Sequence, residues 1–321
     1  MNPSPVIENL TSPAILFFLL GVIATLIRSD LNIPTPIARG LSIYLLMAIG
    51  LHGGVELARS GITAGITLIL AIAVLGSILV PLISYAVLRF KLDPINAAAV
   101  AACYGSISAV TFITATSFLD ASQIPYGGYM VAAMALMESP AIIVGVLIAR
   151  LSQNRTNPQP MPWGKLGHEA FLNSAVLILL GSLLIGYVTG DNGYAKIKPF
   201  MDEPFYGLLC LFLLDMGLIA AQRLRDLGRF GPFLILFAIA MPAIQAVIGI
   251  SLSKALGFSD GDTLLMAVLW GSASYIAVPA ALRLALPNAN ASLYLPLSLG
   301  ITFPFNIAIG IPMYLWIIES F

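Results

Sequence analysis

The feature that most constrains this chain is a series of ten long apolar runs, most of which can cross a lipid bilayer as a helix. A helix needs about 20 apolar residues to span a hydrocarbon core of about 30 Å. We therefore expect an all-α polytopic membrane protein with ten transmembrane helices. The apolar runs cover residues 12–27, 34–51, 62–90, 95–119, 126–151, 169–188, 204–221, 230–256, 263–286 and 292–318.

The composition fits a lipid environment and excludes other classes of protein. Of the 321 residues, 59% are hydrophobic and 9% are charged, whereas a soluble globular domain carries about 25% charged residues. The net charge is zero and there is no basic block, so no nucleic-acid partner is expected. Cys103 and Cys210 lie in apolar runs, apart from His52 and His168, so we expect no disulfide, zinc site or cofactor.

A polar stretch at 152–167 divides the chain near its middle and leaves five apolar runs on each side. An odd number of spans in each half places the halves in opposite orientations, which predicts a 5+5 inverted repeat. Similar patterns recur in the two halves at offsets of 167, 166 and 164 residues. They are Ile49-Gly50 with Met216-Gly217, Gly105-Ser106-x-Ser108 with Gly271-Ser272-x-Ser274, and Ser139-Pro140 with Phe303-Pro304.

The basic residues predict the orientation, because cytoplasmic loops are enriched in Lys and Arg. With the N-terminus outside, 11 of the 15 basic residues fall in cytoplasmic loops, including the interface anchors Arg223 and Arg283. Residues 1–10 contain no Lys or Arg, so we expect a retained first helix instead of a signal peptide. We expect an integral protein of the bacterial inner membrane, with both termini outside and the 152–167 linker in the cytoplasm. The four outer basic residues are Arg59, Lys196, Lys198 and Lys254.

Two of the runs carry the same interruption, an aromatic-Gly-Ser-x-Ser pattern at 104–108 and at 270–274. Glycine weakens a helix, serine competes for its hydrogen bonds, and the freed backbone groups must be buried in protein or line a polar cavity. The pattern predicts discontinuous fourth and ninth helices whose positive N-terminal ends bind a small anion. Close helix packing without a ligand is the alternative. The candidate substrate-binding residues are Gly105, Ser106, Ser108, Thr111, Gly271, Ser272, Ser274 and Tyr275.

Two acidic residues inside apolar runs, Glu138 and Asp215, are a further signal of function. An ionisable residue in a membrane helix costs at least about 2.5 kcal/mol, so it usually faces a cavity or a partner. Pro140 frees backbone carbonyls near Glu138, and Asn306 lies close to the matching position of the second half. Glu138 and Asn306 are therefore candidate sodium ligands. Alternatively, both form hydrogen bonds within the bundle, and Asp215 lies at a helix end.

Four groups of residues carry a family resemblance. They are Gly50-Leu51-His52-Gly53-Gly54, residues 105–111, Met137-Glu138-Ser139-Pro140-Ala141, and Arg283 with Pro287-Asn288-Ala289-Asn290. Together they resemble the sodium-dependent bicarbonate transporter family of SbtA-like permeases. The resemblance implies sodium-coupled bicarbonate uptake by a 5+5 inverted repeat that assembles as a homotrimer. It also implies scaffold helices in 1–60 and 168–228, core helices in 61–151 and 229–321, and anion contacts by Ser108, Thr111, Ser272 and Ser274.

The chain departs from this family at the second interruption. Tyr275 stands where the family has an aspartate, and Ala277 where it has a serine. The alternative cargo is therefore another small anion or an organic carboxylate, with different or no sodium coupling. The 152–167 linker is shorter than the family's loop, which weakens the expectation of a PII-like regulatory partner.

An intramembrane enzyme or a sensor is a third class of function. An enzyme needs an activated nucleophile or a metal within the bilayer. The apolar runs contain no Ser–His pair, Asp–Asp pair or His-Glu-x-x-His sequence, and no segment is long enough for a soluble output domain. We therefore expect a transporter and no enzymatic activity.

Overall fold

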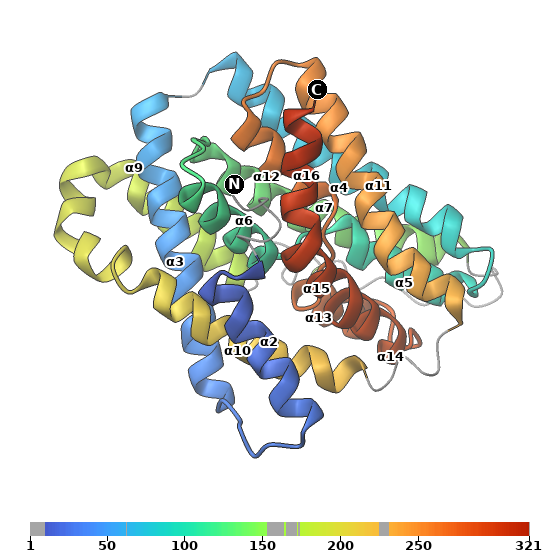
Figure 1. Cartoon of the computed structure of the whole chain (residues 1–321). Coiled ribbons are helices and arrows are strands. Elements are labelled where there is room, and N and C mark those ends of the chain that lie inside the picture. The colour runs from blue at the N-terminus through green and yellow to red at the C-terminus, as the bar shows by residue number, and fades with distance from the viewer. Residues whose placement is uncertain are drawn as a thin grey trace.

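The computed structural model describes residues 10–61, 63–152, 164, 172, 174–224 and 231–320, and all regular structure in these residues is helical (Figure 1). The first half contains α2 (Pro13–Leu26), α3 (Thr35–Ser60), α4 (Ala64–Leu88), α5 (Pro94–Gly105), α6 (Ala109–Ala121) and α7 (Tyr129–Ser152). The second half begins with α9 (Ser174–Met201), α10 (Phe205–Leu224), α11 (Pro232–Ala255), α12 (Asp260–Trp270) and α13 (Ala277–Ala285). It ends with α14 (Ala291–Leu295), η2 (Pro296–Thr302), α15 (Phe303–Phe305), η3 (Asn306–Gly310) and α16 (Ile311–Glu319), of which η2 and η3 are π-helical.

Eight helical segments in the described residues are long and apolar enough to cross a membrane. Two of them, Pro94–Ala121 and Ala291–Glu319, combine several of the elements above. The sequence predicted ten spans. The difference lies in run 12–27, which forms only the 14-residue helix α2, and in run 263–286, which is divided between α12 and α13.

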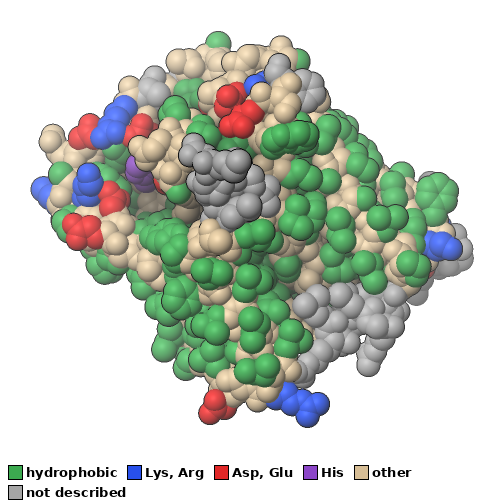
Figure 2. Space-filling view, viewed as in Figure 1, with side chains coloured by type: hydrophobic (Ala, Val, Ile, Leu, Met, Phe, Trp, Pro, Cys, Tyr) green, Lys and Arg blue, Asp and Glu red, His purple; other side chains and the backbone are tan. Residues whose placement is uncertain are grey.

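The surface is that of a protein in lipid. Figure 2 shows apolar side chains over most of the visible face, with charged side chains gathered at its extremities. Large side chains such as Leu184 and Val188 of α9 are 61% and 74% exposed. The composition predicted this, because 9% charged residues cannot cover a surface that faces water.

Glycine brings two pairs of helices into close contact. A Cβ on Gly21 of α2 would lie 2.2 Å from the Leu214 carbonyl oxygen of α10, and one on Gly186 of α9 would lie 2.2 Å from the Leu51 carbonyl oxygen of α3. Small residues allow backbones to approach in this way in membranes. The first helix of each half therefore packs against the second helix of the other half, and Figure 1 shows α3 beside α9 and α2 beside α10.

Helix α9 is bent at Gly190. Gly190 has φ +54°, a left-handed conformation that suits glycine. Arg59 at the end of α3 forms ion pairs with Glu56 and with Asp191, the residue after the bend. The bend falls two residues beyond the predicted run 169–188.

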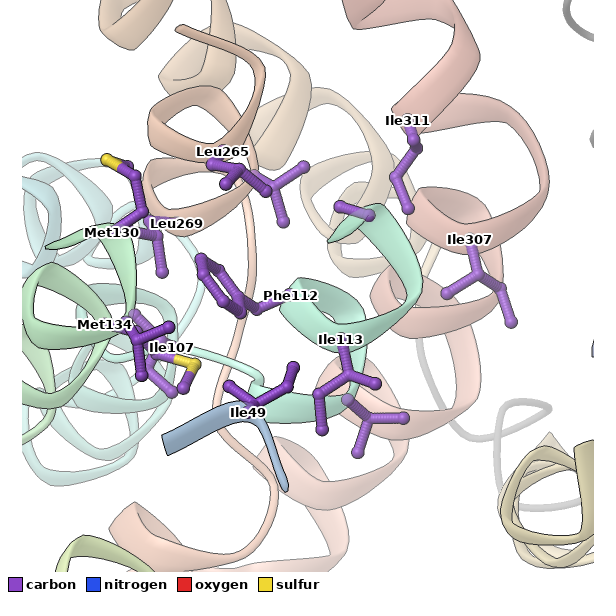
Figure 3. Packing of buried hydrophobic residues seen from close by; sticks show 14 of the residues in the cluster. Ile49, Ile107, Phe112, Ile113, Met130, Met134, Leu265, Leu269, Ile307 and Ile311 are labelled. Atoms are coloured by element: carbon purple, nitrogen blue, oxygen red, sulfur yellow. The ribbon is translucent and has the colours of Figure 1, made fainter. Parts of the chain in front are cut away.

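The short helices of the interruptions lie in the interior. Pro94–Ala121 is the most buried of the candidate spans, since 94% of an apolar 18-residue stretch within it is buried. Figure 3 shows Ile107, Phe112 and Ile113 packed among side chains of α3, α7, α12 and the C-terminal helices. Most of the predicted linker 152–167 lies outside the described residues. So do His168, Arg155, Lys165, Arg225 and Arg229.

Candidate functional site

The first interruption is a three-residue gap between α5, which ends at Gly105, and α6, which begins at Ala109. Ser108 is the N-cap of α6, and its hydroxyl oxygen accepts hydrogen bonds from the Thr111 N–H (3.2 Å) and the Thr111 hydroxyl (2.8 Å). Gly105 lies against Pro81 of α4, where a Cβ would come within 2.4 Å of the proline ring. Glycine is therefore required at this helix end.

The second interruption spans 271–276, between α12 and α13. The Ser274 hydroxyl accepts from the Val278 N–H at 3.3 Å, but Ser274 is not the N-cap of α13, because that position is Ile276. A Cβ on Gly271 would lie 2.7 Å from the carbonyl oxygen of Pro242 in α11. In both halves, a glycine at the end of a short helix thus packs against a proline inside the preceding long helix.

The two interruptions cross each other and exchange hydrogen bonds. The Ser274 N–H donates to the Cys103 carbonyl at 2.7 Å. On the other side the link is indirect, because the Ser108 N–H donates to the Ser272 hydroxyl (3.0 Å), which donates to the Leu269 carbonyl (3.4 Å). Carbonyls that lost their helical partners are thus satisfied by the interrupted segments.

A cavity of about 600 Å³ lies beside this crossing. Its wall comes from both interruptions and from helices α3, α6, α7, α9, α10, α13, α14 and η2. Two acidic side chains in the wall, Glu138 of α7 and Asp215 of α10, are 6% and 5% exposed. The exposed Arg39, Arg223 and Arg283 also line it. The cavity therefore combines buried acids, hydroxyl groups and three exposed guanidinium groups.

The predicted site residues divide into those that line this cavity and those behind its wall. Ser108, Ser274, Tyr275 and Glu138 line it. The residues behind the wall, all of them buried, are Gly105, Ser106, Thr111, Gly271, Ser272 and Asn306. Those residues therefore do not contact a ligand in the cavity, and they affect its binding only by shaping the wall.

Tyr275 connects the two interruptions through its side chain. Its hydroxyl oxygen accepts from the Ser108 hydroxyl at 3.4 Å, and its ring packs edge-on against Phe303 at 5.5 Å between centroids. Since Ser108 accepts two bonds from Thr111 and donates one to Tyr275, its own capacity is used. Among the described residues, the hydrogen bond from Ser108 uses the Tyr275 hydroxyl as an acceptor and leaves its proton available for donation.

Sequence reasoning missed Arg39 as a cavity residue and treated Arg223 and Arg283 only as interface anchors. All three stand near the ends of apolar runs, where a basic residue usually anchors a helix at the lipid headgroups. No local pattern distinguishes such an anchor from a side chain at the rim of a cavity, because the difference depends on which helices surround it.

A second cavity, of about 320 Å³, lies further along the same helices. On α3 the first cavity reaches Leu46 and the second begins at Ala48; on α6 the corresponding residues are Ile113 and Thr116. Less than one helical turn therefore separates the two cavities along these helices, and Figure 3 shows Ile49 and Ile113 in this region. The polar residues of the second cavity are His52, Thr116, Asp120, Tyr126, Tyr194 and Asp202.

Crossed helix interruptions beside a cavity that contains buried acids and hydroxyl groups, within a bundle of membrane-length helices, are features of the class of membrane transporters. The family model of the Na+-dependent bicarbonate transporter superfamily matches residues 13–319, so the chain belongs to that superfamily. It is an integral membrane protein of a transporter family, as the sequence resemblance predicted. A comparison with curated proteins finds no match.

Proposed function

We propose that this protein is a secondary active transporter that takes up bicarbonate together with sodium and binds the anion at the crossing of the two helix interruptions. The observation that carries the proposal is the cavity of about 600 Å³ into which Ser108, Ser274 and Tyr275 project from both interruptions. Membership of the superfamily supports the cargo and the coupling ion.

The anion is bound by neutral donors at the ends of short helices. The positive end of α6 begins beside Ser108 and favours a negative charge. Ser274 and Tyr275 add hydroxyl groups without a full positive charge, so the anion can leave again. Gly105, Ser106, Thr111, Gly271 and Ser272 act from behind the wall, by shaping the interruptions and satisfying their hydrogen bonds.

The architecture that fits this proposal is a ten-helix 5+5 inverted repeat. The reciprocal glycine contacts of α2 with α10 and of α3 with α9 support it, as does the glycine–proline contact found in each half. In this arrangement the scaffold helices lie in 1–60 and 168–228, and the core helices in 61–151 and 229–321. Transport follows from movement of the core against the scaffold.

Sodium is held near Glu138, the buried acid of the core that faces the cavity. Carbonyl groups freed by Pro140 in the same helix supply further oxygen ligands. Asn306 was the other candidate ligand, but its amide groups contact Gly271 and Tyr314. No other cofactor is proposed.

The large cavity opens to the cytoplasm in the predicted orientation, because its three arginines belong to segments assigned to that side. The second cavity then faces outward. We further propose a homotrimer in the bacterial inner membrane with both termini outside. A PII-like regulatory partner would act from the cytoplasmic side.

A second candidate cargo is another small anion or an organic carboxylate, with different or no sodium coupling. A cavity of about 600 Å³ has room for more than bicarbonate, and Tyr275 places a neutral hydroxyl where the resembled family has an acid.

Labelled bicarbonate uptake into proteoliposomes, with and without an inward sodium gradient, tests the proposal. We expect uptake that a sodium gradient accelerates and that unlabelled carboxylates do not inhibit. Uptake that does not respond to the sodium gradient would refute sodium coupling. Inhibition by carboxylates would favour the second candidate cargo. No uptake under either condition removes bicarbonate as the substrate.

A further inference from the structure

The end of α12 leaves a backbone carbonyl without its helical partner inside the membrane region. In a continuous helix the Gly271 carbonyl would accept from the N–H of Tyr275, four residues later. That bond is absent because α13 begins only at Ala277. Gly271 is buried, and an unsatisfied backbone group in such a place costs several kcal/mol. This carbonyl needs a donor from elsewhere in the protein.

Asn306 supplies that donor. Its side-chain NH₂ group donates to the Gly271 carbonyl at 2.7 Å, and its amide oxygen accepts from the Tyr314 hydroxyl at 2.9 Å. The orientation of the amide follows from chemistry, because a carbonyl can only accept and must therefore face the NH₂ group. Asn306 is 1% exposed and Tyr314 is fully buried, so water does not compete for these bonds.

The backbone around Asn306 makes room for this arrangement. Asn306 begins the π-helical segment η3, and a Cβ on Gly310 would lie 2.7 Å from the Asn306 amide oxygen and 3.2 Å from the Tyr314 hydroxyl. Short π-helical segments are frequent at functional sites. The glycine and the widened helical turn thus allow the amide and the tyrosine to meet.

The same C-terminal segment holds the second interruption at both ends. Asn306 binds Gly271, and Phe303 packs against the ring of Tyr275. Ser274 lies between these two contacts and lines the cavity together with Tyr275, whereas Asn306 does not reach the cavity.

We propose that Asn306, oriented by Tyr314, is a positioning residue that places Ser274 and Tyr275 at the wall of the anion cavity. This inference rests on the proposed function, because it assigns a role at the same site. It predicts that loss of the Asn306 donor changes anion affinity, although Asn306 never touches the anion.

Transport kinetics of three variants test the inference. Asn306→Leu removes both amide groups at similar volume, and Tyr314→Phe removes only the hydroxyl that orients the amide. Ser298→Ala is the matched control, since the hydrogen bonds that its buried hydroxyl in η2 forms with the described residues go only to the carbonyls of Tyr294 and Leu295. In proteoliposomes we expect the half-saturation concentration for bicarbonate to rise about tenfold for Asn306→Leu and about threefold for Tyr314→Phe. Ser298→Ala should match the wild type.

A second measurement does not depend on the cargo. Ser274→Cys places a thiol at the cavity wall, while the native Cys103 and Cys210 are buried. We expect its reaction rate with a water-soluble maleimide to change several-fold when Asn306→Leu is added, and to stay constant when Ser298→Ala is added. A changed rate in a protein that transports no anion would refute the proposed function and keep the positioning role.

The inference is overturned if Asn306→Leu and Tyr314→Phe lower the unfolding temperature but leave the half-saturation concentration and the thiol reaction rate unchanged. That result would make Asn306 a stability residue only. If Asn306→Leu does not fold, Tyr314→Phe decides by the same two readouts.

Discussion

The two helix interruptions begin with the same Gly-Ser-x-Ser pattern, yet they differ in length and in hydrogen bonding. The first spans three residues and is closed by its own N-cap, Ser108. The second spans 271–276, has no side-chain cap hydrogen bond from its N-cap residue Ile276, and depends on Asn306 for the carbonyl of Gly271. Both interruptions use hydrogen bonds from the other half of the chain, since the Cys103 carbonyl accepts from the Ser274 N–H, but the longer one also needs the side chain of Asn306.

The serines behind the wall show the same contrast. Ser272 accepts from the Ser108 N–H and donates to the Leu269 carbonyl. Ser106, at the matching position of the first half, is fully buried and its hydroxyl has no partner among the described residues. Two residues in the same pattern therefore carry unequal structural roles.

The largest expected effect follows from this pair. Ser272→Ala leaves two buried backbone groups without partners, which costs about 2–4 kcal/mol in total. Ser106→Ala removes no hydrogen bond and should be close to neutral. Thermal unfolding in detergent and labelled uptake measure both variants. Equal losses from the two substitutions would contradict the assigned asymmetry.

Glycine substitutions should produce the next largest effect. An alanine Cβ at Gly105 meets the Pro81 ring at 2.4 Å, and one at Gly271 meets the Pro242 carbonyl at 2.7 Å. Overpacking of this kind costs about 1–3 kcal/mol, so we expect both variants to lose stability and transport, with Gly105→Ala the more severe. Gly207→Ala is the control, because no atom lies within 4 Å of its Cβ position. A loss of stability in Gly207→Ala equal to that in Gly105→Ala would refute the packing argument.

The two serines that line the cavity, Ser108 and Ser274, should differ by a smaller amount. Ser108→Ala removes an N-cap worth about 0.5–2 kcal/mol together with the link to Tyr275. Ser274→Ala loses only the longer bond from the Val278 N–H and one cavity hydroxyl. Uptake kinetics should show a higher half-saturation concentration for both, and the greater loss of stability for Ser108→Ala. Wild-type uptake kinetics in both variants would contradict the proposal that the interruptions bind the anion.

The smallest effect is expected from Tyr275→Phe. The ring contact with Phe303 is kept, so the unfolding temperature should stay near that of the wild type. The cavity loses one hydroxyl donor, worth about 0.5–1.5 kcal/mol, which raises the half-saturation concentration about two- to tenfold. An unchanged half-saturation concentration would show that the hydroxyl serves only Ser108.

From the sequence, the residues that line the cavity could be distinguished only in part from the residues that support its wall. Hydropathy marked eight segments that form membrane-length helices among the ten predicted spans, and the Gly-Ser-x-Ser pattern marked both interruptions within a few residues of where the helices end. The pattern, together with the family resemblance, predicted eight substrate-binding residues, of which Ser108, Ser274 and Tyr275 line the cavity. A side chain's direction at an irregular backbone depends on neighbouring helices, which local spacing does not describe.

The sequence by itself determined that this is a helical membrane protein of the bicarbonate transporter superfamily and where its helices break. Hydrophobicity and helix-weakening residues act locally, so they can be recognised without knowing the fold. Only the tertiary structure decided that Ser272 relays a hydrogen bond while Ser106 does not, and that Asn306 binds the Gly271 carbonyl. A backbone group that loses its helical hydrogen bond at an interruption needs another partner. That partner comes from a segment distant in the chain, so local sequence does not reveal it.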